Sequence, residues 1–142
     1  MVDRAIVASK VAMIRDAVER VRDVLPSDGA AFTANRDARE VVALNLLIAI
    51  QEAIDLAAHW IADAGLVVPG THRELFTGLA DRGVISADLG SRLAAASGMR
   101  NIIAHQYGTV DWSRVHAAAS SGLVDLEALC NEMARQTLGG GS

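Results

Sequence analysis

The stretch Val41-Val42-Ala43-Leu44-Asn45-Leu46-Leu47-Ile48-Ala49-Ile50 is the longest apolar run in the chain. It lies inside a segment from Arg36 to about Ala64, in which large apolar residues occur at helical spacing around most of the helix circumference. A helix that is apolar on nearly all sides is buried, so this segment predicts the central helix of the fold. Asn45 interrupts the run, which is far shorter than the roughly 20 residues of a membrane span, and we expect no membrane partner.

The segment before this helix also has a helical pattern. Its apolar residues alternate at spacings of four and three: Val7, Val11, Ile14, Val18, Val21 and Leu25. This pattern predicts a first long helix that packs along one seam. The turn Pro26-Ser27-Asp28-Gly29 closes it, and we expect a polar connection from there to Arg36.

The segments after the central helix begin with residues typical of helix N-caps: Thr71, Ser86 and Asp111. Thr71 with Glu74 has the form of a capping box, at the start of a short helix that ends near Gly83. The next helix runs from Ala87 toward Met99. The last helix begins after Asp111 and either is continuous or breaks near Gly122. No segment has the two-residue period of a strand. The sequence therefore predicts an all-α bundle of about four to six helices.

Length and charge set limits on this bundle. The chain has 142 residues, enough for one domain, which we place at residues 1–138 and follow with a flexible tail, Gly139-Gly140-Gly141-Ser142. The net charge of −4 and the five aromatic residues argue against a broad nucleic-acid surface, so any grip on phosphate is local. The lone Cys130 lies in an apolar run, and we interpret it as a buried side chain of a cytoplasmic protein.

The stretch Arg100-Asn101-Ile102-Ile103-Ala104-His105-Gln106-Tyr107 carries the strongest chemical signal. Arginine holds phosphate through a fork of donors, and histidine moves a proton near neutral pH. On a helix Asn101 and His105 share one face, while Arg100 and Tyr107 nearly align on an adjoining face. These residues suit phosphodiester chemistry. The structural alternative is that Asn101 and His105 only make hydrogen bonds at a helix end.

Charged residues on the central helix are further candidates. Glu52 and Asp55 are positioned to pair with Arg100, or else are solvated or interface charges. His59 follows Asp55 by four residues, which suits either a buried acid–base pair that reaches the motif or a structural hydrogen bond. The other histidines, His72 and His116, lack partners at metal-ligand spacing. We therefore expect no metal site and no cofactor.

The string from Met99 to Tyr107, followed by Val110-Asp111-Trp112 and Val115, resembles the HepT-like branch of the HEPN superfamily. An R-x4-H pattern alone is weak, but Asn101 after the arginine and Tyr107 two residues past the histidine make it specific. The resemblance covers most of the chain, since Pro69–Phe76, Leu79–Ser86 and the helix with Asp55 also fit. Met99 departs from the family, in which an aromatic residue is common.

This resemblance implies an all-helical homodimer that is a metal-independent endoribonuclease, the toxin of a type VII-like toxin–antitoxin module. It implies RNA, not DNA, as substrate, and a minimal nucleotidyltransferase antitoxin that adds AMP to Tyr107. We expect His105 to take the proton of a 2′-hydroxyl, Arg100 to neutralise the charged phosphate and Asn101 to orient either group. One motif has only one histidine, which favours two motifs facing each other in a dimer.

A second hypothesis is a non-catalytic HEPN module that binds a nucleotide or docks the partner nucleotidyltransferase. It uses the same Arg100, Asn101 and His105, and the acidic balance of the chain mildly favours it. The sequence does not separate the two hypotheses.

Overall fold

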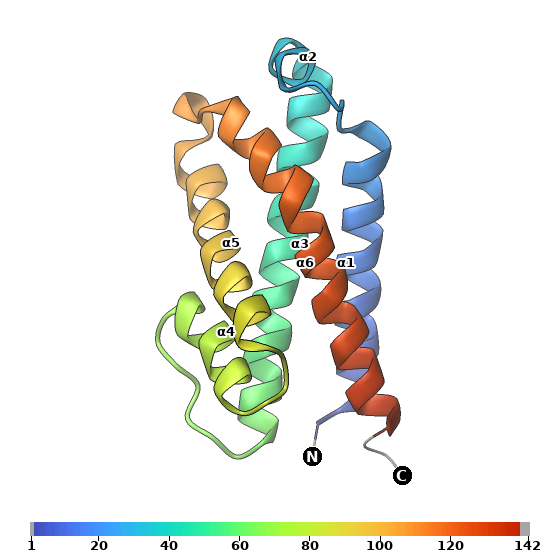
Figure 1. Ribbon diagram of the computed structural model, residues 1–142, viewed down its shortest axis with the longest axis vertical. Coiled ribbons are helices and arrows are strands. Elements are labelled where there is room, and N and C mark those ends of the chain that lie inside the picture. The colour runs from blue at the N-terminus through green and yellow to red at the C-terminus, as the bar shows by residue number, and fades with distance from the viewer. Residues whose placement is uncertain (1, 140–142) are drawn as a thin grey trace.

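The computed structural model describes residues 2–139, and every regular element in this part of the chain is helical. In chain order the elements are α1 (Arg4–Val24), α2 (Gly29–Ala34), α3 (Arg36–Asp63), α4 (His72–Asp81), α5 (Ala87–Gln106), the 3₁₀ turn η1 (Tyr107–Thr109) and α6 (Trp112–Gly139). The long helices form the body of the bundle, with α2 at one end and α4 at the other (Figure 1). The prediction of an all-α bundle of about four to six helices is confirmed.

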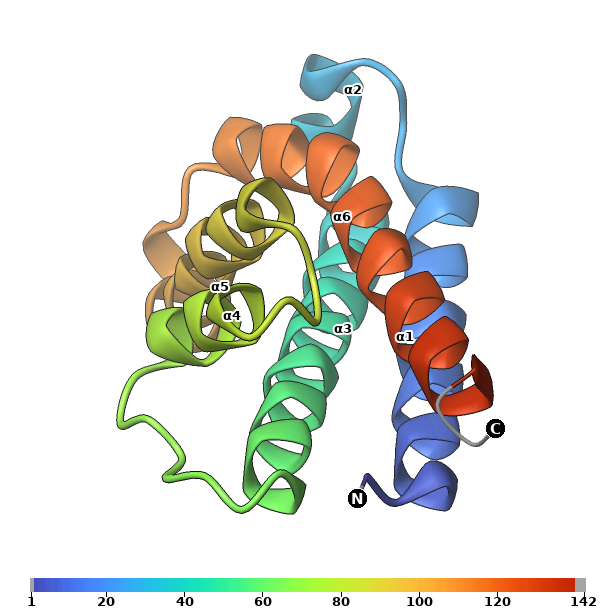
Figure 2. The same cartoon turned by 60° about the horizontal axis from the view of Figure 1, so that its bottom comes forward.

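Helix α3 is the central element, as its apolar circumference predicts. It packs against every other α-helix of the described chain. In Figure 2 it lies between α1 on one side and the pair α4 and α5 on the other, with α6 crossing over it. Its buried side chains come from nearly every turn: Ala38, Val42, Ala43, Leu46, Ala49, Ile50, Ala53, Ile54, Leu56, Ala57 and Ile61.

By length and composition alone, α3 is also apolar enough to cross a membrane, with a mean hydropathy of 1.8 over an 18-residue window. Half of that window is buried inside the bundle, which is the packing of a core helix. The remainder leaves an apolar surface open, on which Leu44 is 57% exposed. Burial thus explains most, but not all, of the apolar composition of α3.

Helix α1 packs along a single seam, as predicted. Val7, Val11, Ile14, Val18 and Val21 are buried, and Asp3 caps the helix by accepting hydrogen bonds from the backbone of its first turn. The thiol of Cys130, on α6, lies against this helix and is fully buried. Burial raises the pKa of Cys130 to about 11, so the thiol stays protonated near neutral pH. The interpretation of Cys130 as a buried apolar group is confirmed.

The connection between α1 and α3 differs from the prediction, because residues 29–34 form the short helix α2 instead of a polar link. The Asp28 side chain caps it, accepting hydrogen bonds from the Ala30 and Ala31 amides at 3.2 and 3.3 Å. Phe32 anchors it, fully buried with its ring 6.0 Å from Trp112. Six residues are too few to show a helical period, so only the tertiary burial of Phe32 reveals this helix.

The three predicted N-caps are confirmed. Thr71 Oγ1 accepts from the Glu74 amide at 3.2 Å and Ser86 Oγ from the Leu89 amide at 3.1 Å. Asp111 Oδ1 accepts from the amide of Ser113 at 3.0 Å, and this helix, α6, has no break near Gly122. Gly139 is the last residue of α6, so the predicted tail does not begin there. Its other residues, 140–142, lie outside the described part.

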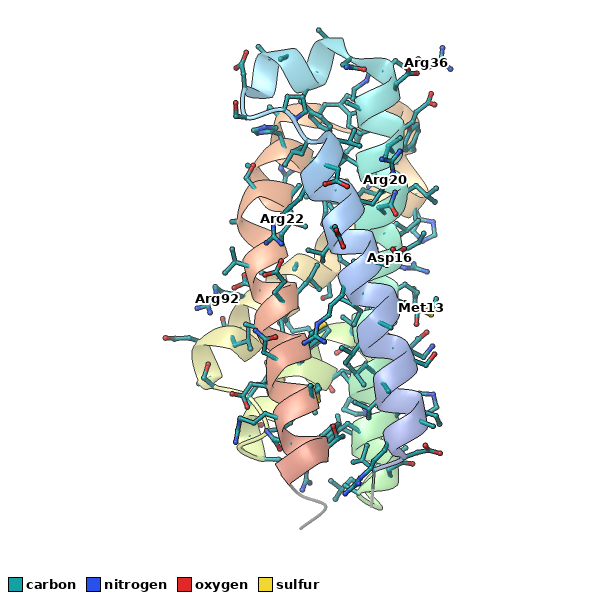
Figure 3. The ribbon with its side chains drawn as sticks, turned by 90° about the vertical axis from the view of Figure 1, so that its right-hand side faces the viewer. Met13, Asp16, Arg20, Arg22, Arg36 and Arg92 are labelled. Atoms are coloured by element: carbon teal, nitrogen blue, oxygen red, sulfur yellow. The ribbon has the colours of Figure 1, made fainter. Side chains whose placement is uncertain are left out.

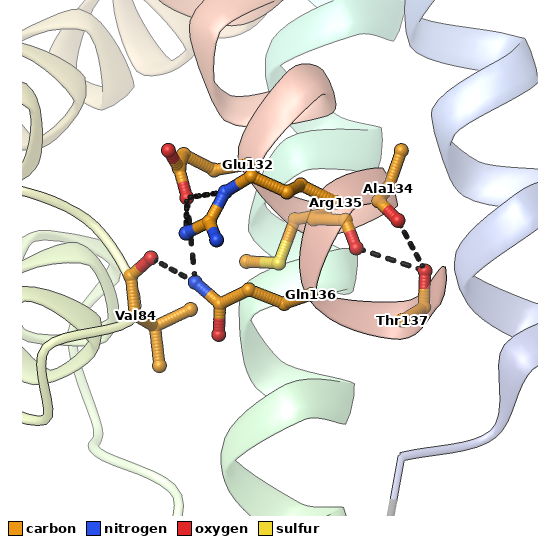
Figure 4. A network of polar contacts seen from close by, with 7 residues as sticks. Val84, Glu132, Ala134, Arg135, Gln136 and Thr137 are labelled. Atoms are coloured by element: carbon orange, nitrogen blue, oxygen red, sulfur yellow. Dashed lines mark hydrogen bonds and ion pairs between the residues drawn. The ribbon is translucent and has the colours of Figure 1, made fainter. Parts of the chain in front are cut away.

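Polar contacts hold α6 against its neighbours. Arg22 of α1 pairs with Glu127, and Arg92 of α5 pairs with Asp125 at 2.8 Å, so α6 is held from two sides (Figure 3). Near its C-terminal end, Gln136 donates a hydrogen bond to the carbonyl oxygen of Val84 in the connection between α4 and α5 (Figure 4). These contacts fix α6 relative to α5.

Helices α4 and α5 are in close contact at Gly90. A Cβ added there would lie 2.8 Å from the Cβ of Ala80 and 3.0 Å from the carbonyl oxygen of Phe76. Glycine is therefore required sterically for this packing. The close approach holds the second half of α4 against the first turn of α5, the helix that carries the R-x4-H motif.

Candidate functional site

The motif lies on the last two turns of α5. The helix continues through Gly98 without a break and ends at Gln106, so Arg100, Asn101 and His105 belong to one rigid element. Ile103, between them, is 3% exposed and anchors this end of the helix in the core. The sequence left open whether the motif continues the preceding helix or starts a new one, and the structure shows that it continues.

Arg100 is half-buried and held by two hydrogen bonds. Its Nε donates to Gln51 Oε1 at 2.9 Å, and its Nη1 donates to Asn101 Oδ1 at 3.2 Å. The amide nitrogen of Gln51 in turn donates to Asp55 Oδ1 at 3.1 Å. Asp55 therefore fixes which end of the Gln51 amide faces Arg100. The remaining N–H donors of the guanidinium stay available for an anion.

Of the alternatives considered for Glu52 and Asp55, the pairing with Arg100 is not observed. Both carboxylates pair with Lys10 of α1, whose Nζ lies 2.8 Å from Glu52 Oε2 and 3.6 Å from Asp55 Oδ2. The hydrogen bond to Glu52 is the main reason that the pKa of Lys10 lies above its ordinary value. Lys10 and Gln51 were not among the predicted site residues. For Gln51, the sequence did offer a signal, which is its spacing of four residues from Asp55.

Asn101 and His105 are exposed on the same face of α5, one turn apart, as predicted. In the described part of the chain, the His105 ring forms no hydrogen bond or ion pair, so both of its nitrogens are open to a ligand. Neither alternative considered for His59, a buried acid–base pair or a structural hydrogen bond with Asp55, is observed, because His59 is exposed and Asp55 is engaged by Lys10 and Gln51.

Tyr107 is the first residue of η1 and is 43% exposed. Its ring and that of Trp112 form a T-shaped pair, with the ring centroids 5.3 Å apart. The guanidinium of Arg39, from α3, lies over the same indole at 5.3 Å from its centroid, and its Nε is buried without a hydrogen bond within the described chain. Arg36 is close enough for its charge to interact with an ionised Tyr107. The sequence analysis singled out neither arginine.

The remaining histidines have structural environments. Nε2 of His116 lies 2.7 Å from the carbonyl oxygen of Pro26, and its ring packs on Phe32. This contact ties the turn after α1 to α6. Within residues 2–139, no group of three or more His, Cys, Asp or Glu side chains is clustered as a metal site would need. The expectation that the protein acts without a metal stays a prediction.

An all-α bundle around one apolar helix, with an R-x4-H-x-Y motif at an exposed helix end, has the features of an HEPN domain. Residues 14–133 match the family model described as Ribonuclease HepT-like. The chain belongs to the HepT-like ribonuclease family, which confirms the predicted fold and ribonuclease class.

Known relatives are similar over nearly the whole chain. The mRNA nuclease HepT of Shewanella oneidensis MR-1 is 30% identical over 122 residues, covering 86% of this chain and 91% of that protein. A solved toxin–antitoxin complex with AMP-PNP superimposes with a TM-score of 0.84 at 27% identity, covering 92% of this chain and 98% of that chain. A tri-AMPylated Shewanella oneidensis HEPN toxin in complex with MNT antitoxin has a TM-score of 0.84 at 28% identity, covering 93% and 98%.

The fold also extends to more distant proteins. YutE of Bacillus subtilis, a cytosolic protein of unknown function, has a TM-score of 0.81 at 14% identity, covering 96% of this chain and 92% of that chain. At this identity the likeness concerns the fold alone.

Proposed function

We propose that this protein is a metal-independent endoribonuclease toxin of a type VII-like toxin–antitoxin module, active in the cytoplasm as a homodimer. The observation that carries the proposal is the arrangement at the end of α5. There Arg100 is held by Gln51 and Asn101, and the exposed ring of His105 lies one turn beyond Asn101. The name of the relative from Shewanella oneidensis, an mRNA nuclease, supports RNA as the substrate.

In the proposed reaction, His105 removes the proton of a ribose 2′-hydroxyl, and that oxygen attacks the adjacent phosphorus. The bond from phosphorus to the 5′-oxygen breaks, which leaves a 2′,3′-cyclic phosphate and a 5′-hydroxyl. Arg100 neutralises the charge that develops on the phosphate. Because Asn101 Oδ1 accepts from Arg100, the amide NH₂ of Asn101 is left to donate to a phosphate oxygen. The motif of the second subunit is the proposed source of the proton for the leaving oxygen.

Cleavage of single-stranded RNA in EDTA tests this function. We expect the purified protein to cleave, and His105→Ala to reduce the rate by roughly 10²–10⁴-fold, because general acid–base catalysis contributes about that much. His59→Ala is the matched control, since it removes an equally exposed histidine on α3, outside the motif. Equal cleavage by wild type and His105→Ala would point to a contaminating nuclease. A folded wild type that binds the antitoxin but never cleaves would favour the non-catalytic module.

The regulatory part of the proposal is that a minimal nucleotidyltransferase antitoxin adds AMP to Tyr107. Tyr107 is the only tyrosine of the chain, and a similar HEPN toxin is known in a tri-AMPylated form with its MNT antitoxin. The guanidinium of Arg39 lies over Trp112, the ring that Tyr107 also contacts, and the charge of Arg36 interacts with Tyr107, so both arginines are candidates to pair with the added phosphate. The attached nucleotides would hinder RNA from reaching the end of α5.

Intact-mass spectrometry after incubation with antitoxin and ATP tests this regulation. We expect AMP-sized additions on the wild type and none on Tyr107→Phe. This variant should keep ribonuclease activity, because no proton transfer uses the phenol, and should escape neutralisation. Additions that persist on Tyr107→Phe would place the modification elsewhere. Trp112→Phe is a useful control, since it alters the ring that packs on Tyr107 without removing the hydroxyl.

A further inference from the structure

A cavity of about 420 Å³ lies between the start of α4 and the middle of α5. Its lining includes Thr71, His72, Arg73, Ser97, Gly98 and Asn101. Known ligand pockets have volumes of about 300–1,000 Å³, so this space can hold a small molecule or one unit of a polymer. The proposed reaction and the proposed regulation of Tyr107 leave this cavity without a role, although Asn101 of the motif is part of its lining.

The cavity opens onto the face of α5 that carries the motif. Gly98, Asn101 and His105 follow one another at spacings of three and four, which places them along one side of the helix. Asn101 belongs both to the motif and to the cavity lining. His105 is about 6 Å further along the helix axis. A ligand at His105 that continues along α5 toward its N-terminus therefore enters the cavity next.

The groups that line the cavity suit a ribose-phosphate unit. Arg73 is exposed and has no hydrogen bond or ion pair with another described residue, so its guanidinium is free to bind phosphate. Thr71 and His72 add polar atoms, and no aromatic residue other than His72 lines the space. A site without a stacking platform favours the sugar and phosphate over the base. The net charge of −4 makes such a local grip on the RNA backbone necessary.

We propose that this cavity binds the nucleotide next to the scissile bond, with Arg73 pairing with its phosphate. The RNA strand then lies along α5, from His105 past Asn101 to Gly98. This inference rests on the proposed ribonuclease function, and it assigns Arg73 to substrate binding and not to the chemical step.

Gly98 offers a second way to probe the cavity. It is an interior helical residue, and a Cβ added there has no heavy atom within 4 Å. A Cβ at this position therefore extends into open space and needs no change in the backbone. Gly98→Leu should fill part of the cavity while leaving the helix intact, because leucine also has a better helix propensity than glycine.

The experiment measures binding of a fluorescein-labelled single-stranded RNA by anisotropy at several salt concentrations, in the His105→Ala background to prevent cleavage. Arg73→Ala should weaken binding about tenfold, the scale of one charged hydrogen-bonded contact. It should also reduce the slope of log K against log salt by about 0.7, the value for one phosphate contact on a single strand. Gly98→Leu should weaken binding with the slope unchanged. Arg82→Ala, at the other end of α4, is the matched control and should bind as the parent does.

Circular dichroism must first show that each variant is folded. If Gly98→Leu does not fold, the surface variant Arg73→Ala decides the result alone. RNA binding unchanged in Arg73→Ala overturns the proposal. Weaker binding of the antitoxin with RNA binding unchanged would instead assign this surface to the protein partner. The proposed function is read separately, from cleavage by the wild type, so that either idea can fail without the other.

Discussion

Arg100 is positioned by a neutral partner, and this choice has a chemical consequence. A carboxylate at this place would hold the guanidinium but would also cancel the charge that it offers to a phosphate. The amide oxygen of Gln51 provides the hydrogen bond at 2.9 Å and leaves the full positive charge available. Asp55 contributes indirectly, since it fixes the orientation of the Gln51 amide and is itself paired with Lys10.

We therefore expect Gln51 to be a positioning residue. Gln51→Leu should lower kcat/KM for a defined RNA about tenfold, because a hydrogen bond to a charged group is lost from a half-buried site. Gln136→Leu is the control, since it removes a structural hydrogen bond to Val84 far from the motif. It should lower Tm without changing kcat/KM. If Gln51→Leu has a lower Tm but an unchanged kcat/KM, Gln51 has only a structural role.

The residues of the motif could be predicted from sequence, but their partners could not. Arg100, Asn101, His105 and Tyr107 are adjacent in the chain, and helical spacing alone relates their faces. Lys10 meets Glu52 and Asp55, and Arg100 meets Gln51, only because α1 and α5 flank α3 from its two sides. No periodicity in the sequence contains that packing, which is why the sequence left Glu52 and Asp55 between a pairing with Arg100 and a role as solvated or interface charges.

At the level of elements, helices with both an apolar stripe and a cap were predicted well. The stripe of α1 and the caps of α4, α5 and α6 appear where the sequence places them. Gly98 and Gly122 do not break their helices, because neighbours on both sides of each continue a packed face. The short α2 was missed, since its one anchor, Phe32, has meaning only with Trp112 in place.

Helix α5 connects a capped N-terminal end to the motif at its C-terminal end. Ser86→Ala removes the hydrogen bond from the Leu89 amide and should lower the free energy of unfolding by about 1 kcal/mol. Ser120→Ala is the control, because that serine is exposed to solvent at a position away from the ends of α6. Alanine is the better helix former there, so this variant should not lower the free energy of unfolding. Chemical denaturation measures both. Equal stability of Ser86→Ala and the wild type would show that packing alone defines the start of α5.

The whole molecule presents one face on which the motif and an unpaired apolar surface lie together. We define this face by Lys10 and Met13 of α1, Leu44 and Gln51 of α3, and Arg100 of α5. Helices α1 and α5 lie on opposite sides of α3 (Figure 2), but the contacts of Lys10 with Glu52 and of Arg100 with Gln51 show that both border the same stretch of α3. Met13, on the side of α1 seen in Figure 3, is 45% exposed, and Leu44 is 57% exposed. Exposed apolar side chains beside a polar site are typical of an interface.

We expect this face to form the homodimer and to bring the two motifs together. Sedimentation at micromolar concentration should show a species of twice the 14.9 kDa chain mass. Leu44→Glu should shift it to the monomer and remove RNA cleavage, because a charge on this face opposes burial and each motif has a single histidine. Val124→Glu is the matched control, since Val124 is 62% exposed but lies on α6, outside the face. A wild type that sediments only as a monomer and still cleaves RNA would mean that one motif is sufficient, with water as the acid.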